Sequence, residues 1–289
     1  MHFVRYQKYD DRIEIFDSEE FCPTHILECG QVFCYKKIDE NKFIVYPQDK
    51  CCLIYKTDFG YCLKTQDVVF FENYFDLTSD YLEIKNQLKS FKELEFALSF
   101  GSGIRILKQD ILETIISFII SANNNIKRIT ATLDKIRAHF KKRISNDLNY
   151  EIYAFPTLSE LASLDEEFFK SVGAGYRAKY LVETISKLNN YKNSNTNAIY
   201  NLETKTLLNA LLQFKGVGRK VAECILLFGF GRKDVFPVDT WIKKIYKDIF
   251  GENTLNADQI SDVLIARYGK NSGYAQQYLF YSKRENNHI

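Results

Sequence analysis

The spacing of hydrophobic residues along the chain changes character near residue 70. Before that point, residues 1–65 hold short segments rich in β-branched and aromatic side chains, such as Lys42–Tyr46 and Cys51–Lys56. Segments of this kind are typical of β-strands. Polar turn sequences separate them at 39–42, 47–49 and 58–60. Because connections this short join antiparallel neighbours, the N-terminal part is predicted to be an antiparallel sheet.

After residue 70 hydrophobic residues recur every three or four positions, which is the period of a helix. Ile111, Ile115, Phe118 and Ile119 form one such face. The same spacing continues through 126–136, 174–189, 203–213, 219–229, 240–250, 257–267 and 273–284. The pattern predicts an α+β fold, with an antiparallel sheet domain and flanking helices over residues 1–105 and helical domains over 106–289.

The composition adds an asymmetry of charge to this picture. The 289 residues are 46% hydrophobic and 26% charged, as in globular proteins, and the length favours two or more packed units. The net charge is only +2, but residues 1–105 hold 13 Lys and Arg against 18 Asp and Glu, whereas residues 106–289 hold 26 against 19. A basic half indicates contact with a polyanion.

The cysteine and histidine positions argue against metal sites. Seven cysteines without C-x-x-C spacing and four scattered histidines fit neither a disulfide framework nor a zinc site. The C-terminal region lacks the cysteines that an iron–sulfur cluster needs. With no apolar run of about 18 residues and a charged N-terminus, we expect no membrane association. The sequence thus predicts an intracellular protein, in the cytoplasm or nucleoid of a prokaryote or the nucleus of a eukaryote, without metal or cofactor.

A hairpin between two apolar helices, at about 207–228, is the most informative segment. Gly216 and Gly218 permit positive φ and close backbone approach, and the helix that follows presents free amides that favour an anion. Three cations flank the turn: Lys215, Arg219 and Lys220. The segment is a candidate phosphate site for nucleic acid. A plain helical corner with solvated lysines is the alternative.

The basic character extends beyond the hairpin. Residues 214–247 carry eight Lys and Arg against three acids, which fits a phosphate-contacting surface. Asp239 lies directly before a helical pattern, where an N-cap would lie. Its role from position alone is that of a cap.

These residues resemble the helix-hairpin-helix Gly/Pro–Asp superfamily of DNA glycosylases, in which a G-V-G-x-K hairpin precedes a V-P-V-D-like sequence. Four further segments resemble 8-oxoguanine DNA glycosylases, and they occur in the family's order: Cys29–Phe33, Ser121–Arg128, Gly175–Ala178 and Tyr274–Phe280. The resemblance spans about residues 25–283. It implies a sheet domain plus helical domains, with the active site in the cleft between them.

The resemblance also implies an activity. It indicates a monomeric base-excision repair enzyme that flips 8-oxoguanine out of double-stranded DNA, preferentially opposite cytosine, and removes it. Lys220 matches the lysine that attacks the sugar C1′ and forms a Schiff base, which gives the enzyme abasic-site lyase activity as well. Asp239 matches the aspartate that stabilises the cationic sugar and assists proton transfer.

Four matched residues are implied to bind the flipped base. The Gly30 carbonyl would accept the N7–H that 8-oxoguanine has and guanine lacks. Gln276 would read the Watson–Crick edge, and Phe280 would stack on the base. Cys224, four residues after Lys220, would lie against the base. The alternatives are a simple turn for Gly30 and core packing for Cys224 and Phe280.

Four others are implied to handle the gap and the orphaned cytosine. Arg128 and Arg177 would donate to cytosine, Tyr176 would wedge beside the gap, and Asn123 would fill it. Solvated helix-face charge is the alternative for the two arginines.

Two positions depart from the family pattern. Lys215 stands where many relatives have proline, and Trp241 stands where eukaryotic members have histidine, so that histidine's role is not carried over. Two other functions stay open: a glycosylase for another damaged base in the same superfamily, and a non-catalytic helix-hairpin-helix DNA-binding protein.

Overall fold

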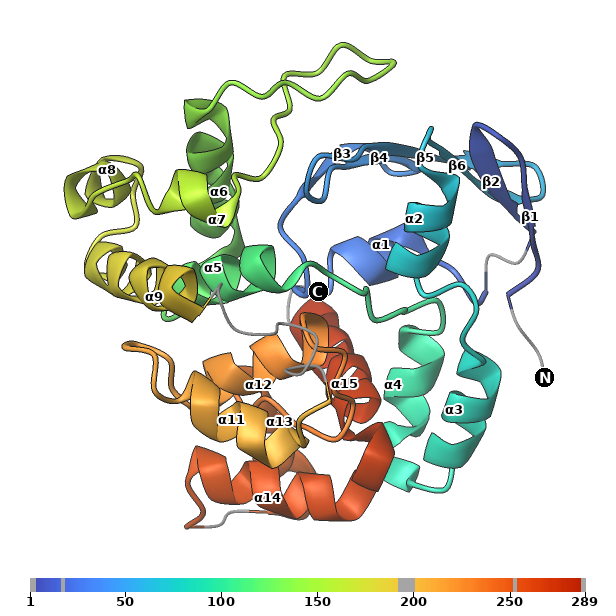
Figure 1. Ribbon diagram of the computed structural model, residues 1–289. Helices are drawn as coiled ribbons and strands as arrows, with labels where there is room; N and C mark the ends of the chain where they lie inside the picture. The colour runs from blue at the N-terminus through green and yellow to red at the C-terminus, as the bar shows by residue number, and fades with distance from the viewer. Residues whose placement is uncertain (1–3, 17–18, 192–200, 252–253, 287–289) are drawn as a thin grey trace. The chain divides into compact units, whose positions relative to one another are not determined.

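The computed structural model describes residues 4–16, 19–191, 201–251 and 254–286, and within them the predicted α+β fold is confirmed (Figure 1). The chain divides into two compact units that are not those of the predicted boundary at 105/106. The first comprises Met1–Val45, Cys52–Lys108 and Gly231–Ile289, and the second comprises Tyr46–Cys51 and Gln109–Phe230. The C-terminal helices therefore group with the N-terminal sheet.

The sheet of the first unit has six strands among the described residues, all antiparallel, in the order β1-β2-β6-β5-β4-β3. Their bounds are β1 Tyr6–Lys8, β2 Arg12–Ile15, β3 Tyr35–Asp39, β4 Lys42–Val45, β5 Cys52–Thr57 and β6 Gly60–Lys64. The turns predicted at 39–42, 47–49 and 58–60 lie between the strands that they were expected to join. The stretch predicted as strands also contains a short helix, α1 (Pro23–Leu27), because proline favours the first helical turn.

Helices complete the first unit. They are α2 Val68–Tyr74, α3 Tyr81–Leu88, η1 Lys92–Leu94, α4 Glu95–Phe100, α13 Thr240–Phe250, α14 Ala257–Tyr268, η2 Gly269–Asn271 and α15 Ser272–Asn286. Helix α15 packs against α4, α13 and α14. Arg105 is fully buried, and its guanidinium donates to the carbonyls of Phe75, Asp76 and Ser79, which offsets the cost of removing the charge from water.

The second unit is helical. Its helices are α5 Ile111–Ser121, α6 Ile126–His139, α7 Leu158–Leu161, α8 Glu166–Ser171, α9 Arg177–Tyr191, α11 Thr204–Leu211 and α12 Arg219–Phe228. Helix α5 packs against α6, α9 and α12, as its apolar repeat predicts. Phe118 of α5 stacks on Phe228 of α12, with ring centroids 5.4 Å apart.

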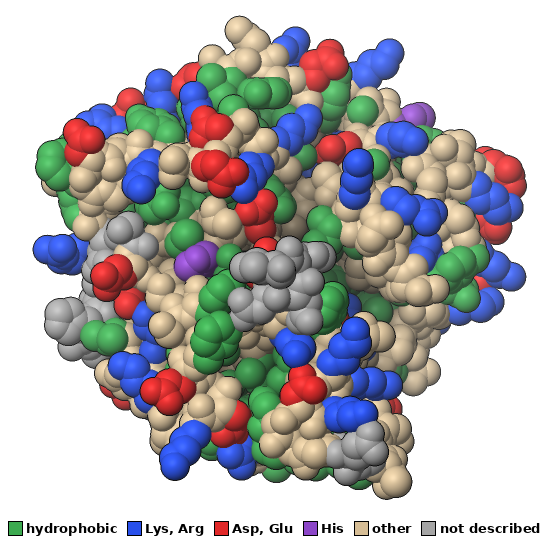
Figure 2. Space-filling model, turned by 180° about the vertical axis from the view of Figure 1, so that it is seen from behind, with side chains coloured by type: hydrophobic (Ala, Val, Ile, Leu, Met, Phe, Trp, Pro, Cys, Tyr) green, Lys and Arg blue, Asp and Glu red, His purple; other side chains and the backbone are tan. Residues whose placement is uncertain are grey.

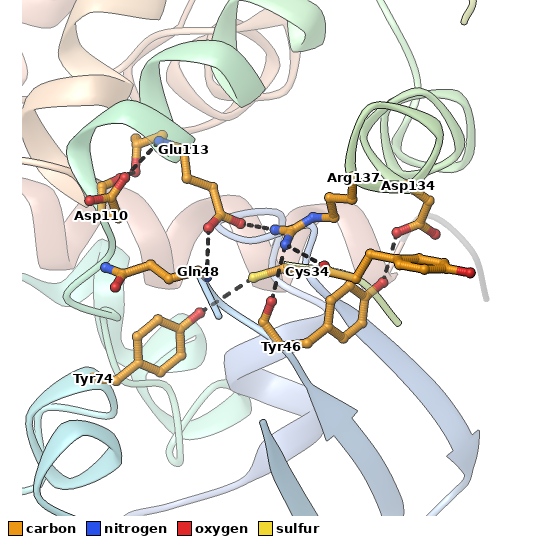
Figure 3. Close-up of polar contacts among 10 residues, drawn as sticks. Cys34, Tyr46, Gln48, Tyr74, Asp110, Glu113, Asp134 and Arg137 are labelled. Atoms are coloured by element: carbon orange, nitrogen blue, oxygen red, sulfur yellow. Dashed lines mark hydrogen bonds and ion pairs between the residues drawn. The ribbon is translucent and has the colours of Figure 1, made fainter. Parts of the chain in front are cut away.

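A buried ion pair ties α5 to α6 within this unit (Figure 3). Glu113 and Arg137 pair with each other and are 7% and 2% exposed. The second Glu113 oxygen accepts a hydrogen bond from the backbone N–H of Gln48 at 3.0 Å. The Arg137 guanidinium lies 5.3 Å from the Tyr46 ring centroid. Because each partner is satisfied, the pair fastens the segment 46–51 to both helices.

The surface carries both signs of charge. Figure 2 shows Lys and Arg side chains interspersed with Asp and Glu over the visible face. Within the described ranges, none of the helices is long and apolar enough to cross a membrane.

Candidate active site

The hairpin between α11 and α12 requires glycine at only one of its two predicted positions. Gly216 has φ +79°, and a Cβ there would overlap the Tyr180 ring. Gly218 has φ −84° and is the N-cap of α12, and a Cβ there would meet nothing within 4 Å. The close approach that the sequence predicted therefore occurs at Gly216, against a helix rather than against open solvent.

Helix α9 holds this hairpin along its length. Besides the Tyr180 contact, Lys187 donates to the Gln213 carbonyl at 2.8 Å. Glu183 pairs with Lys215 at 3.1 Å. The spacing of 180, 183 and 187 places all three contacts on one face of α9. Lys215, which replaces the usual proline, thus gives the turn an ionic support.

Both predicted phosphate-binding cations have acidic partners. Lys215 is paired with Glu183, and Arg219 donates to Glu223 at 2.9 Å. The Glu183 pair is exposed, so a phosphate can compete for Lys215 at low cost. Glu223 is 1% exposed, which makes the Arg219 pair costlier to break.

Lys220 lies in the first turn of α12, directly after the hairpin. Its side chain is half-buried, with Nζ 5.6 Å from the Phe118 ring centroid. Cys224 follows one turn later and is buried. The helix therefore carries the amine and the thiol on one face, as predicted.

Asp239 is the N-cap of α13, and one of its oxygens makes the cap. Oδ1 accepts from the amides of Trp241 and Ile242, both at 2.9 Å. No described residue donates to Oδ2. The carboxylate can therefore cap the helix with one oxygen and present the other to a reacting group. Trp241 is half-buried, and Lys244 Nζ lies 4.9 Å from its ring centroid.

The turn that contains Gly30 is fastened to α15. Gln277 donates to the Cys29 carbonyl at 2.8 Å, and Arg284 donates to the Glu28 carbonyl. Gly30 itself has φ +78°, and none of the hydrogen bonds among the described residues ends on its carbonyl. Two neighbouring carbonyls are thus occupied, and the Gly30 carbonyl stays available.

The other two predicted base-binding residues come from α15. A Cβ on Gly30 would lie 3.2 Å from Phe280 Cε1, so the turn and the ring are in contact. Gln276 is 6% exposed, and its buried Oε1 accepts no hydrogen bond from the described residues. A buried acceptor without a donor is costly, which favours a ligand that supplies one.

The predicted opposite-base residues lie around the start of α9. Arg177 is 5% exposed and donates to the carbonyls of Ala122 at 2.7 Å and Asn123 at 2.8 Å. Tyr176 is exposed, with its ring 4.4 Å from the Arg177 guanidinium. Asn123 is exposed with φ +49°. Arg177 thus orients the segment that presents Asn123, while Arg128 is exposed in the first turn of α6.

Lys233 differs from the other cations of the basic stretch. Burial lowers the pKa of its amine to about 8, although the nearby Asp76 carboxylate raises it. Its Nζ lies 5.6 Å from the Tyr274 ring centroid. This one charge of the 214–247 segment is therefore lost as the pH rises through about 8, the lowered pKa of Lys233.

Family models match both parts of the chain. Residues 14–115 match the N-terminal domain of 8-oxoguanine DNA glycosylase, and residues 116–266 match the HhH-GPD superfamily of base excision DNA repair proteins. The chain belongs to the 8-oxoguanine DNA glycosylase family of this superfamily.

Relatives and solved structures of this family extend the match. A probable N-glycosylase/DNA lyase of Methanothermobacter thermautotrophicus is 31% identical over 72% of each chain. An N-glycosylase/DNA lyase of Arabidopsis thaliana is 33% identical over 62% of this chain, which spans 51% of that relative's length. The Clostridium acetobutylicum 8-oxoguanine glycosylase/lyase, solved with double-stranded DNA containing cytosine opposite the lesion, superposes with a TM-score of 0.91 and 35% identity. The match covers 99% of this chain and 100% of that one.

The residues implied by the glycosylase family fall in both units. Lys220 and Cys224 belong to the second unit, whereas Asp239, Gly30, Gln276 and Phe280 belong to the first.

Sequence reasoning missed Tyr180, Gln277 and Arg284, which hold the hairpin and the Gly30 turn. Of these three, only Gln277 could have been found from the sequence, because it lies beside the predicted site residue Gln276. Among the described residues, no group of three or more His, Cys, Asp or Glu is placed to hold a metal ion.

Proposed function

We propose that this protein is a DNA glycosylase that removes 8-oxoguanine from double-stranded DNA and cleaves the resulting abasic site. The observation that carries the proposal is Lys220 at the start of α12, directly after the hairpin, in a chain that matches a glycosylase/lyase over 99% of its length. A monofunctional glycosylase has no need of an amine at this position.

The chemistry assigns one step to each of two residues. The Lys220 amine attacks C1′ of the nucleotide, the bond from C1′ to the base nitrogen breaks, and the base leaves with a proton. The Asp239 carboxylate stabilises positive charge on the sugar while that bond breaks. The sugar ring then opens to a Schiff base, loss of a C2′ proton expels the 3′ phosphate, and the strand is cut.

Recognition of the base draws on the first unit. The Gly30 carbonyl accepts N7–H, Gln276 Oε1 accepts from the Watson–Crick edge, and Phe280 stacks on the ring. Arg128 and Arg177 confer a preference for cytosine in the opposite strand. For Arg177 this requires that cytosine replace one of the backbone carbonyls to which it now donates.

Borohydride trapping tests the proposal. Wild-type protein and a duplex with 8-oxoguanine opposite cytosine should form a covalent adduct on reduction, and a duplex with guanine should not. Lys220→Gln should abolish the adduct yet still bind the lesion, because binding draws on other residues. A wild-type protein that fails to trap contradicts the lyase assignment, and trapping by the variant means that another amine is the nucleophile.

The opposite-base preference and the oligomeric state need separate measurements. Trapping rates against all four opposite bases should be highest for cytosine, and equal excision opposite adenine refutes the roles of Arg128 and Arg177. We infer a monomer, which light scattering checks directly.

A further inference from the structure

Arg284 is a largely buried cation of the first unit that the reaction described above does not use. It lies in the last turn of α15, and its side chain is 11% exposed. Nη2 donates to the Glu28 carbonyl, and Nε donates to Glu285 at 2.9 Å. The guanidinium carbon lies 5.4 Å from the Phe280 ring centroid. Arg284 therefore contacts both the Gly30 turn and the ring that is proposed to stack on the base.

One nitrogen of this guanidinium has no acceptor. Nη1 is buried and makes no hydrogen bond within the described ranges. It lies 3.2 Å from the position of a Cβ on Gly30, which places it at the turn whose carbonyl is also available. Because a buried charged donor without an acceptor is costly, such a group is explained best by a ligand that completes it.

The two open groups match one edge of the oxidised base. In 8-oxoguanine the N7–H donor is flanked by two carbonyl acceptors, O8 and O6. In guanine N7 is an acceptor. A carbonyl and a charged N–H on the same turn therefore complement an N–H beside a C=O, and they do not complement the same edge of guanine.

We propose that Arg284 is a base-binding residue whose Nη1 donates to the carbonyl oxygen beside N7–H of the flipped 8-oxoguanine. The inference rests on the proposed function. In this arrangement the enzyme makes two contacts with the edge of the base that oxidation changes, one from Gly30 and one from Arg284.

Equilibrium binding to matched duplexes tests the contact. Arg284→Met removes the donors and keeps an apolar side chain of similar length, and a Lys220→Gln background prevents turnover. Affinity for the 8-oxoguanine duplex should fall about 10- to 100-fold, as for a lost hydrogen bond to a charged group. Affinity for the same duplex with a tetrahydrofuran abasic analogue should be unchanged. An equal loss on both duplexes, or no loss on either, overturns the proposal.

Base analogues separate a direct contact from mere support of the turn. Sulfur in place of O8 or of O6 weakens a hydrogen bond at that atom alone. If Arg284 donates to one of these two atoms, sulfur at that atom should lower the affinity of the parent protein much more than that of the Arg284→Met protein. The atom that shows this difference is the acceptor. Losses that are the same in both proteins for both analogues mean that Arg284 only positions Gly30, which contradicts the proposal.

Two further variants complete the design. Arg284→Lys serves if Arg284→Met fails to fold. It keeps a positive charge and should retain part of the preference for the lesion. Lys283→Met removes the neighbouring cation, which pairs with Asp248 at 2.7 Å, and should leave lesion binding unchanged. If the Lys220→Gln protein does not prefer 8-oxoguanine over guanine at all, the proposed function fails rather than this inference.

Discussion

The two oxygens of Asp239 have different surroundings, and this separates its structural role from its chemical one. Oδ1 caps α13 through two backbone amides, while Oδ2 accepts no hydrogen bond from a described residue. Asparagine keeps an oxygen in the capping position but loses the charge. Asparagine at this position therefore tests the proposed catalytic role of the carboxylate while the helix cap is kept.

We expect Asp239→Asn to slow base excision about 10²- to 10⁴-fold, because the charge that we propose to stabilise the sugar cation is lost. The free energy of unfolding should change by less than about 0.5 kcal/mol, since asparagine and aspartate cap helices equally well. Single-turnover excision and urea denaturation measure the two effects. A rate within tenfold of wild type would show that the carboxylate serves the cap alone.

The lowered pKa of Lys233 is a second property of a single residue, and it predicts how the stability of the protein depends on pH. Its pKa is lowered to about 8 in the folded chain, and an unfolded lysine titrates near about 10.4. Between these values the unfolded chain binds more protons, so this residue's contribution to the free energy of unfolding rises with pH. Wild type should therefore gain stability relative to Lys233→Met between pH 7.5 and 9.5 in denaturation titrations. A constant difference across that range contradicts the lowered pKa.

At the scale of elements, α9 organises the second unit's contribution to the site. Arg177 is its first residue and Tyr176 lies directly before it, while its later residues Tyr180, Glu183 and Lys187 hold the hairpin. The segment proposed to read the opposite base and the segment proposed to grip phosphate are thus mounted on one helix.

The two hairpin glycines form a matched pair for testing this arrangement. Gly216→Ala should destabilise the protein by about 1–3 kcal/mol and weaken duplex binding, because it forces alanine into positive φ and against the Tyr180 ring. Gly218→Ala should cost at most about 1 kcal/mol, since φ is negative and the space is open. Urea denaturation and fluorescence anisotropy measure both, and equal effects would show that the Tyr180 contact does not support the turn.

The periodicity of the sequence predicted the elements better than their grouping. The helix predicted over 240–250 has the same bounds as α13. Pairs of apolar residues recur at helical spacing and define one face, and Asp239 marks the start. The short helix α1 was missed, since five residues are too few for a helical period. The grouping of 231–289 with the sheet depends on contacts between distant segments, which local patterns do not encode.

For the candidate site, sequence motifs located the residues that resemble the family but not those that hold them. Gln277 and Arg284 act through backbone carbonyls of the Gly30 turn, and a carbonyl leaves no signature in the sequence. The pairing of Lys215 with Glu183 was likewise invisible, because the two are 32 residues apart.

At the scale of the whole molecule, the modest net charge limits how strongly binding depends on salt. Lys215 and Arg219 already have acidic partners, so these two cations of the hairpin reach a phosphate only by giving up an ion pair. A plot of the logarithm of the association constant against the logarithm of salt concentration should have a slope of about −3 to −5, which corresponds to roughly three to six phosphates. Anisotropy titrations between about 50 and 200 mM salt measure it, and a slope near about −10 contradicts this reading.

The division of the first unit into three stretches has a consequence during synthesis on the ribosome. The Gly30 turn emerges early, but Gln277 and Arg284, which fasten it, are added 247 and 254 residues later. At roughly 5–20 residues per second, the turn waits roughly 12 to 50 seconds for its supports. Residues 109–230, with the hairpin and Lys220, are complete before then. On a nascent chain, the lysine proposed as the nucleophile is therefore complete before the supports of the turn that is proposed to bind the base.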